Sequence, residues 1–312
     1  MNKNIKPELA TLVETPPTDN NWIHEIKFDG YRMLSIINKK STTLLTRNGK
    51  NWANKFPTIE NALKSFPYKN TILDGELVVI DEKGRSRFQL MQNALTENKS
   101  NKVQYFIFDI PYFDNKNLSH ETLLTRKKIL ESAMKHWKHS KNIILTDYIQ
   151  GHGEVVYKSA CKNALEGIVS KEISSYYEQK RTRHWLKVKC GHRQEFVIVG
   201  YTKPKGSRQY FGALLLGVYE RKTLTYCGRV GTGFNQKLLE TIYKKLSKSK
   251  INHCPIGKNA PTEGLKEIQW VKPVLAGEVS FTEWTTDGAL RHPSFLGLRL
   301  DKDVKTIKRE KP

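Results

Sequence analysis

The pattern of residues changes close to position 191, and this change restricts the possible folds more than any other feature of the sequence. Before it, stretches with helical periodicity alternate with apolar stretches typical of strands. After it, short glycine-punctuated strands dominate, and a single helix is expected at about 235–248. About five short strands with one helix are typical of a small closed or partly open β-barrel. The sequence therefore predicts two domains, 1–191 with mixed α and β structure and 192–312 built as a barrel.

Spacing and turn residues predict individual elements. Residues 31–46 predict two strands around a polar turn at Asn38–Lys40, and residues 103–114 predict an apolar strand. Residues 71–81 predict a strand, a turn at Asp74-Gly75 and a second strand, because Asp-Gly is a common turn dipeptide. The basic last twelve residues are expected to fray. Further helices are expected at residues 55–66, 88–97, 121–137 and 153–165.

The charge balance narrows the kinds of partner. Lysine and arginine number 53 against 31 aspartates and glutamates, which gives a formal net charge of +22. Such a surplus favours a polyanionic partner, either nucleic acid or an anionic membrane surface. The alternative is a lysine-rich protein whose basic faces are merely solvated.

The hydropathy pattern and the spacing of the cysteines narrow the class of protein further. No stretch approaches the roughly 18 apolar residues of a membrane-spanning helix, and the first residues contain no apolar signal core. These observations predict an intracellular protein without a membrane segment. The cysteines are isolated in the sequence, so we expect neither a zinc site nor a disulfide framework. They are Cys161, Cys190, Cys227 and Cys254.

The octet Glu25–Arg32 (EIKFDGYR) is the most informative stretch for chemistry. A lysine is a nucleophile only as the free amine, and with a pKa of about 10.4 only about one in a thousand is deprotonated at neutral pH. Neighbouring cations or burial must lower that pKa. Taken alone, the octet also fits a surface hairpin with a Lys–Asp pair. The candidate cations are Arg32, Lys171, Lys187 and Lys189.

Further segments follow the octet in order. Lys187 and Lys189 alternate along an expected strand, so they share one face and form a natural phosphate contact. Glu76 and Glu166 at strand ends could hold a ribose hydroxyl or a hard cation such as Mg²⁺. Each segment alone also fits a solvated strand face or a turn. The order and spacing of all of them together favour nucleotide chemistry.

These segments together resemble the covalent nucleotidyltransferase superfamily of ATP-dependent DNA ligases, RNA ligases and mRNA capping enzymes. Within it, the chain is most similar to the ligase modules of bacterial ligase D. The resemblance covers essentially the whole chain and implies an α+β fold. An ATP-grasp-like adenylation (nucleotidyltransferase) domain with antiparallel sheets would precede a C-terminal OB-fold barrel. The matching stretches are EIKFDGYR, LLTRNGKNW, DGELVVID, YFIFDIPYFD, residues 153–171, WLKVK and RHPSFLGLRLDKD.

The resemblance also implies a reaction and residue roles. Lys27 would attack the α-phosphorus of ATP, AMP would pass to the 5′-phosphate at a DNA nick, and the 3′-hydroxyl would displace AMP. Phe108 would stack on adenine, although a core position in an apolar strand is its other interpretation. Motif position implies that Glu25 lies near adenine and that Arg32 and Arg47 lie near the ribose or the phosphates. It implies that Glu76 contacts the ribose or a metal ion and that Glu166 binds a metal ion. The α-phosphate would be contacted by Lys171, Lys187 and Lys189, and the pyrophosphate by Arg299, Asp301 and Lys302.

Cofactors and partners follow from the same resemblance. It implies ATP with Mg²⁺ or Mn²⁺, nicked double-stranded DNA as substrate, and a monomer in the bacterial cytosol or nucleoid. DNA repair, recombination or end joining is the expected setting, with Ku or another end-binding protein as a possible recruiter. The barrel is expected to swing relative to the first domain.

Alternatives remain open at this point. An RNA ligase or a capping-type nucleotidyltransferase would share the lysine nucleophile, and a non-catalytic nucleic-acid-binding protein could keep the fold. Only 26 residues precede Lys27, which leaves no room for the N-terminal DNA-binding domain of larger eukaryotic members. The chain is therefore expected to be either a stand-alone minimal ligase or a fragment of a longer protein.

Overall fold

The computed structural model describes residues 5–96, 100–138, 140–204 and 206–310. The chain forms two compact units, of which the first ends at Cys190 and the second begins at Gly191. Among the described residues, no helix is long and apolar enough to cross a membrane.

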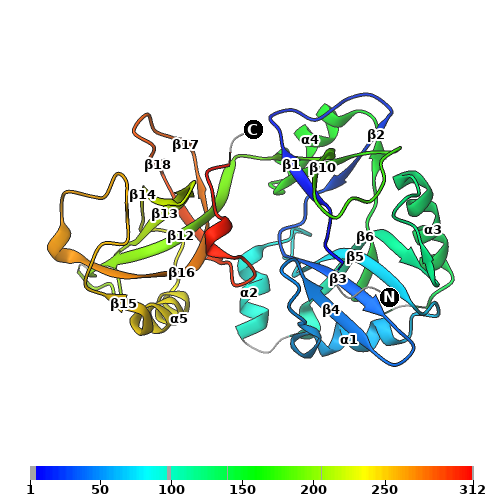
Figure 1. Cartoon of the computed structure of the whole chain (residues 1–312), viewed down its shortest axis with the longest axis horizontal. Coiled ribbons are helices and arrows are strands. Elements are labelled where there is room, and N and C mark those ends of the chain that lie inside the picture. Colours follow the sequence, from blue (N-terminus) through cyan, green and yellow to red (C-terminus); the bar gives the residue numbers. More distant parts are fainter. Residues whose placement is uncertain (1–4, 97–99, 139, 205, 311–312) are drawn as a thin grey trace. The chain divides into compact units, whose positions relative to one another are not determined.

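The first sheet of the first unit has five strands, several of which are labelled in Figure 1. The strand β10 pairs antiparallel with β11 on one side and with β2 on the other. Helix α4 covers this sheet through Val156 and Ala160, which pack with Ile168 and Val188. In spatial order the strands are β1 (Leu9–Leu12), β11 (Arg181–Lys189), β10 (Gly167–Glu172), β2 (Trp22–Ile26) and β9 (Ile149–Gln150), and α4 spans Gly153–Lys162.

The second sheet of this unit has six strands and encloses the larger apolar core with three helices. The expected hairpin over residues 31–46 is confirmed as β3 and β4, and the expected apolar strand as β6. In α3, the side chain of Thr122 accepts a hydrogen bond from the Thr125 amide, so the helix begins at Leu123. The strands are β4 (Thr42–Thr46), β3 (Tyr31–Ile37), β5 (Thr71–Val78), β6 (Gln104–Phe113), β7 (Lys116–Asn117) and β8 (Ile143–Leu145), and the helices are α1 (Pro57–Lys64), α2 (Phe88–Thr96) and α3 (Leu123–Lys135).

The prediction of a turn inside residues 71–81 is wrong. Residues 71–78 form one continuous strand, β5, which pairs with β3 from Thr71 to Leu77. A Cβ atom at position 75 would lie 2.3 Å from the carbonyl oxygen of Phe106, so Gly75 permits close strand contact instead of a turn. Asp74 is fully buried and binds the guanidinium of Arg32, an interaction that no local pattern reveals.

The second unit is a β-structure with one long helix, as expected. A six-stranded sheet contains the long strands β12 and β16, and helix α5 is capped by the side chain of Asn235. The strands are β12 (His192–Thr202), β13 (Leu214–Glu220), β14 (Thr223–Val230), β15 (Lys250–Ile251), β16 (Ile268–Phe281), β17 (Glu283–Trp284), β18 (Leu290–Arg291) and β19 (Ser294–Leu298), and α5 spans Gln236–Leu246. Short 3₁₀ turns occur at Ala53–Lys55, Ser100–Lys102, Ser247–Ser249, Leu265–Glu267 and Val304–Thr306.

The prediction of a frayed C-terminus is wrong for residues 301–310, and residues 311–312 lie outside the described part. Ile307 is buried, and its carbonyl oxygen accepts a hydrogen bond from the amide of Tyr219. The guanidinium of Arg309 lies 4.2 Å from the ring centre of Trp284. Apolar burial and a cation–π contact therefore hold a segment whose composition alone predicts solvation.

The expectation of four unlinked cysteines is also wrong. Cys161 near the end of α4 and Cys190 directly after β11 form a disulfide, with their Cα atoms 5.2 Å apart. They are 29 positions apart in the sequence, and only the packing of α4 against β10 and β11 brings them together. Cys227 is buried and Cys254 is exposed, both as thiols.

Candidate active site

Lys27 and Glu166 lie together at one end of the first sheet. Lys27 directly follows β2, and its backbone amide donates a hydrogen bond of 3.0 Å to the carbonyl of Gly167 at the start of β10. The Lys27 Nζ donates to the Glu166 Oε1 at 2.5 Å. The Lys27 side chain is 21% exposed, whereas that of Glu166 is only 4% exposed. An amine that a solvent molecule or a ligand can reach is thus held by a buried carboxylate.

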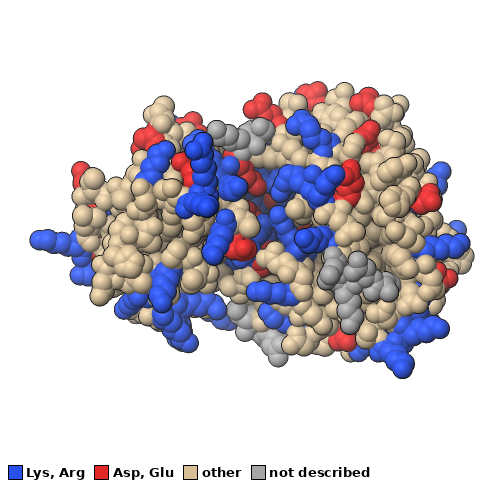
Figure 2. All heavy atoms as spheres, viewed as in Figure 1, with Lys and Arg blue, Asp and Glu red and all other residues tan. Residues whose placement is uncertain are grey.

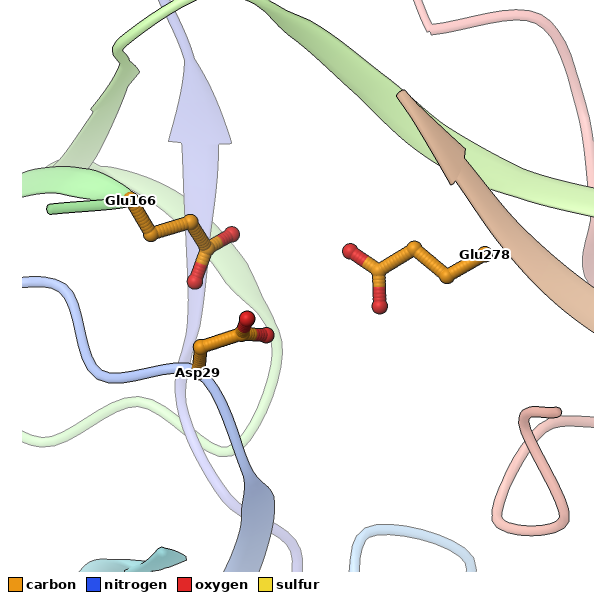
Figure 3. A group of neighbouring side chains, drawn as sticks. All are labelled: Asp29, Glu166 and Glu278. Carbon is orange, nitrogen blue, oxygen red and sulfur yellow. The ribbon is translucent and has the colours of Figure 1, made fainter. Parts of the chain in front are cut away.

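Asp29 adds a second carboxylate to this end of the sheet. Carboxylate oxygens of Asp29 and Glu166 lie within 4.8 Å of one another, and Figure 3 shows the two side chains side by side. Figure 3 also labels Glu278, which belongs to β16 of the second unit. Asp29 was not among the ligands predicted from the sequence, although it stands in the octet. Two neighbouring carboxylates supply oxygen ligands of the kind that Mg²⁺ and Mn²⁺ prefer.

Gly30 follows these carboxylates for a structural reason. A Cβ atom at this position would lie 2.0 Å from the carbonyl oxygen of Leu77 on β5. Any other residue would push the loop that carries Lys27 and Asp29 away from the second sheet. The glycine of the octet therefore allows close packing of this loop.

Glu25 sits in a buried cluster with two lysines. Its Oε2 accepts a hydrogen bond of 2.6 Å from the Nζ of Lys171 on β10, and its Oε1 accepts one from the Nζ of Lys127 on α3. Burial lowers the pKa of Lys171 to about 8, and the nearby charge of Lys127 also lowers it, while Glu25 opposes both effects. Lys127 was missed by the sequence reasoning.

Arg32 and Phe108 belong to a neighbouring cluster of rings and cations. Arg32 binds Asp74 through two hydrogen bonds, Nε to Oδ1 at 2.6 Å and Nη2 to Oδ2 at 2.7 Å. The centre of the Phe108 ring lies 4.5 Å from the Arg32 Cζ and 4.2 Å from the Lys171 Nζ. Phe108 is only 7% exposed and also contacts Trp185. Its stacking on adenine stays a prediction, and its observed partners are cations and an aromatic ring.

The remaining candidates of the first unit come from both sheets. Lys187 and Lys189 are half-buried on β11, opposite Val169 and Gly167 of β10, and share one strand face as predicted. Glu76 is half-buried on β5 of the other sheet, opposite Arg32. Binding of a metal ion by Glu76 together with Glu166 therefore stays a prediction.

Arg47 lies just after a strand of the second sheet. It directly follows β4, in a turn where the Gly49 amide donates to the Thr46 carbonyl. Its side chain is half-buried. The structure places it in the strand-to-turn position expected from the sequence, and its contact with a nucleotide stays a prediction.

The candidates near the C-terminus form an ion-pair network within the second unit. Arg299 binds Asp301 through two hydrogen bonds of 3.0 and 2.9 Å, and its Nη1 donates to the Glu278 Oε2 at 2.9 Å. The Lys302 Nζ lies 2.7 Å from the Glu195 Oε1. Their contact with pyrophosphate stays a prediction, and the network also contains Glu195 and Glu278, which sequence reasoning missed.

Comparison with known protein families settles the class of the chain. Residues 7–189 match the family described as ATP dependent DNA ligase domain, and residues 207–302 match the ATP dependent DNA ligase C terminal region. The chain belongs to the ATP-dependent DNA ligases. The resemblance stated from the motifs is therefore confirmed, and the matches do not favour an RNA ligase or a capping enzyme.

Individual relatives support the same assignment. The ligase is 40% identical to the multifunctional non-homologous end joining protein LigD of Pseudomonas aeruginosa over 99% of this chain, but it spans only 37% of that relative. It is 32% identical to the SPbeta prophage-derived DNA ligase-like protein LigB of Bacillus subtilis, over 64% of this chain and 72% of the relative.

The solved structures support the fold. The ligase resembles a mycobacterial DNA ligase D complexed with ATP and MES, with a TM-score of 0.76 and 29% identity over 99% of this chain and all of the other. The expected α+β architecture, a nucleotidyltransferase domain followed by an OB fold, is confirmed.

Proposed function

We propose that this ligase seals nicks between a 3′-hydroxyl and a 5′-phosphate through a lysyl–AMP intermediate on Lys27. The contact between the Lys27 Nζ and the Glu166 Oε1 at 2.5 Å carries the proposal. It joins the only lysine of the octet to the carboxylate that precedes β10, and both belong to motifs that resemble those of the family. We further propose that residues 1–191 act as the adenylation domain and residues 192–312 as the OB-fold domain.

In the first step, the Lys27 nitrogen attacks the α-phosphorus of ATP and pyrophosphate leaves. The amine must first lose a proton, because only the free amine is a nucleophile. A divalent ion held by Glu166, with Asp29 or Glu76, would neutralise phosphate charge. Its carboxylate ligands fit Mg²⁺ and Mn²⁺ equally well.

Other residues would bind and orient ATP. Lys187 and Lys189 share a half-buried strand face, which suits a contact with the α-phosphate. Positioning and charge neutralisation are the main contributions that a protein makes to phosphoryl transfer. We propose that Glu25 and Phe108 contact the adenine, and that Arg32, Arg47 and Glu76 contact the ribose or the phosphates. Lys171 would contact the α-phosphate together with Lys187 and Lys189. The pyrophosphate would be contacted by Arg299 and Lys302.

In the later steps, AMP passes to the 5′-phosphate of nicked duplex DNA and the 3′-hydroxyl displaces it. The net charge of +22 supports binding of a polyanion, and Figure 2 shows Lys and Arg side chains on the displayed face of both units. Because relatives are named for non-homologous end joining, we propose that the ligase repairs DNA breaks as a monomer in the bacterial cytosol or nucleoid. Ku or another end-binding protein would recruit it.

The test is an adenylylation assay with α-labelled ATP and Mg²⁺ or Mn²⁺. We expect a label on the 36.0 kDa band of a denaturing gel that is lost on addition of nicked DNA, with formation of sealed product. Sealing of nicked RNA but not of DNA would contradict the proposal, as would labelling by GTP alone.

Lys171 gives this reaction a predicted pH dependence. Its lowered pKa of about 8 means that it loses its positive charge as the pH rises through 8, and an interaction with the α-phosphate weakens. We expect the KM for ATP in adenylylation to rise about tenfold between pH 7 and pH 9.5, the loss of one charge-assisted hydrogen bond. In Lys171→Arg this rise should be absent, because a guanidinium stays protonated.

The matched control for this prediction is Lys158→Arg, an exposed position on α4 of the same unit. It should show the same pH profile as the native ligase. An equal rise of the KM in the native ligase and in Lys171→Arg would contradict the role of Lys171.

A further inference from the structure

We propose that Cys161 and Cys190 form a reversible thiol–disulfide switch that holds Glu166 beside Lys27. Adenylylation is then fast in the disulfide form and slow in the dithiol form. This inference rests on the proposed function, because it concerns the rate of the first step.

The disulfide encloses the short segment that carries Glu166. From Cys161 the chain leaves α4, turns at Ala164 with a positive φ of 54°, and reaches Glu166 directly before β10. The strand β11 then runs back beside β10 and ends next to Cys190. The sulfur atoms therefore join the two chain segments between which Glu166 is held.

Backbone hydrogen bonds connect each sulfur-bearing residue to this segment. The amide of Ala164 donates to the carbonyl of Cys161 at 3.0 Å, and the amide of Cys190 donates to the carbonyl of Glu166 at 2.9 Å. If the disulfide opens, the end of α4 and the end of β11 can separate, and both supports of Glu166 loosen. The Glu166 carboxylate, 2.5 Å from the Lys27 Nζ, then loses its fixed position.

The same link holds the end of the strand with the predicted phosphate-binding lysines. The hydroxyl of Tyr157 on α4 donates to the carbonyl of Lys189 at 3.2 Å, one residue before Cys190. Cys190 also packs against the apolar cluster that contains Val156 and Val188. Loss of the disulfide removes the one covalent contact among these links between α4 and β11.

The two sulfur atoms are chemically suited to reversible exchange. Both cysteines are half-buried, whereas the thiol of Cys227 is buried and burial raises its pKa to about 12. Oxidation by a small disulfide such as oxidised glutathione takes two thiol–disulfide exchanges. One thiolate attacks the small disulfide and releases one glutathione thiol, and the second cysteine attacks the mixed disulfide and releases another. Dithiothreitol reverses the exchange.

The experiment compares the full chain after treatment with oxidised glutathione and after treatment with dithiothreitol. Thiol titration in denaturant should find two thiols in the first sample and four in the second, in agreement with the two free cysteines of the structure. The single-turnover rate of labelling by α-labelled ATP should be about tenfold lower in the dithiol form, because small misplacements of reacting groups are costly. The melting temperature should also fall by about 5 °C or more.

Variants separate the switch from other effects. The double variant Cys161→Ser, Cys190→Ser should label slowly in both samples, and Cys254→Ser, which removes the exposed thiol of the second unit, should respond like the native ligase. Circular dichroism of the dithiol form checks that the fold persists.

Two results would overturn the inference, namely four thiols after oxidation or equal labelling rates in the two redox forms. If the rates are equal while the melting temperature falls, the disulfide only stabilises the fold. Absence of any label in both forms would instead overturn the proposed function, and the inference with it.

Discussion

Replacing Lys27 with alanine should abolish the covalent AMP adduct and nick sealing. The variant lacks the nitrogen that forms the bond to phosphorus, so no rearrangement of nearby groups can restore the first step. The Lys27 side chain is 21% exposed, so its burial contributes little to the fold. The measurement is labelling by α-labelled ATP on a denaturing gel, together with sealing of nicked duplex DNA.

DNA binding should survive in this variant. The affinity for nicked duplex should stay within about twofold, because one of many positive charges is lost. Lys158→Ala is a matched control, since it removes an exposed lysine of the same unit that pairs with Glu154, and it should label like the native ligase. Persistent labelling of Lys27→Ala would show that a different residue is the nucleophile, and loss of DNA binding would indicate misfolding.

Local patterns were sufficient for elements whose stability is decided within one segment. The hairpin at residues 31–46 has a polar turn between apolar strands, and α1 has Ile59 and Leu63 on one buried face. Lys27 and Glu166 were both named as candidates from their motifs, but the contact between them was not predicted.

Long-range packing decided the elements that were predicted wrongly. Asp74-Gly75 forms a turn in many chains, but here Arg32 binds the aspartate and the neighbouring strand β6 approaches the glycine. The disulfide depends on the register of β10 with β11 and on the position of α4, none of which a spacing of 29 reveals.

Lys127 was missed although the sequence holds a signal for its burial. It stands four residues after Leu123 and three before Leu130, which places it on the apolar face of the expected helix. The sequence does not show which residue compensates its charge. The lysine is buried because Glu25, 102 positions earlier, supplies the opposite charge. A buried charge requires a partner, and the partner comes from another element.

The second large effect is expected at Arg126, the residue before Lys127 on α3. Arg126 and Asp109 are both fully buried, and their two hydrogen bonds measure 2.8 and 2.9 Å. The Arg126 Nη1 also donates to the carbonyls of Glu121 and Ser175. One guanidinium thus ties α3 to β6 and to the segment after β10, so it fixes the strand that carries Phe108.

Arg126→Leu should lower the free energy of unfolding by about 3–5 kcal/mol at pH 7, because it leaves the Asp109 carboxylate buried without its partner. Lys64→Ala, which breaks an exposed pair with Glu60 four residues earlier, should cost less than about 0.5 kcal/mol and serves as the control. Chemical denaturation followed by circular dichroism measures both. A cost below 1 kcal/mol for Arg126→Leu would contradict the argument.

The pH dependence of this loss identifies its cause. Burial alone would raise the pKa of Asp109, but the charge and hydrogen bonds of Arg126, together with the charges of Lys171 and Lys127, outweigh burial and lower it. In the native ligase, the pair therefore stabilises the fold above the ordinary aspartate pKa of about 3.9, and this stabilisation fades as the pH falls through the lower folded value. In Arg126→Leu the nearest cation is lost, and only the charges of Lys171 and Lys127 still oppose burial. We expect burial to outweigh them, so that the pKa of Asp109 rises above its unfolded value and its protonation favours the fold as the pH falls.

The deficit of Arg126→Leu should therefore be largest at neutral pH and should shrink between pH 7 and pH 4. The double variant Arg126→Leu, Asp109→Leu removes both charges and should recover most of the stability at pH 7, since replacing a buried ion pair with apolar side chains is often nearly neutral. A deficit that stays constant with pH, or a double variant as unstable as the single one, would mean that lost packing and the hydrogen bonds to Glu121 and Ser175 cause the instability. Recovery in the double variant, in contrast, would show that the cost lies in the unpaired carboxylate.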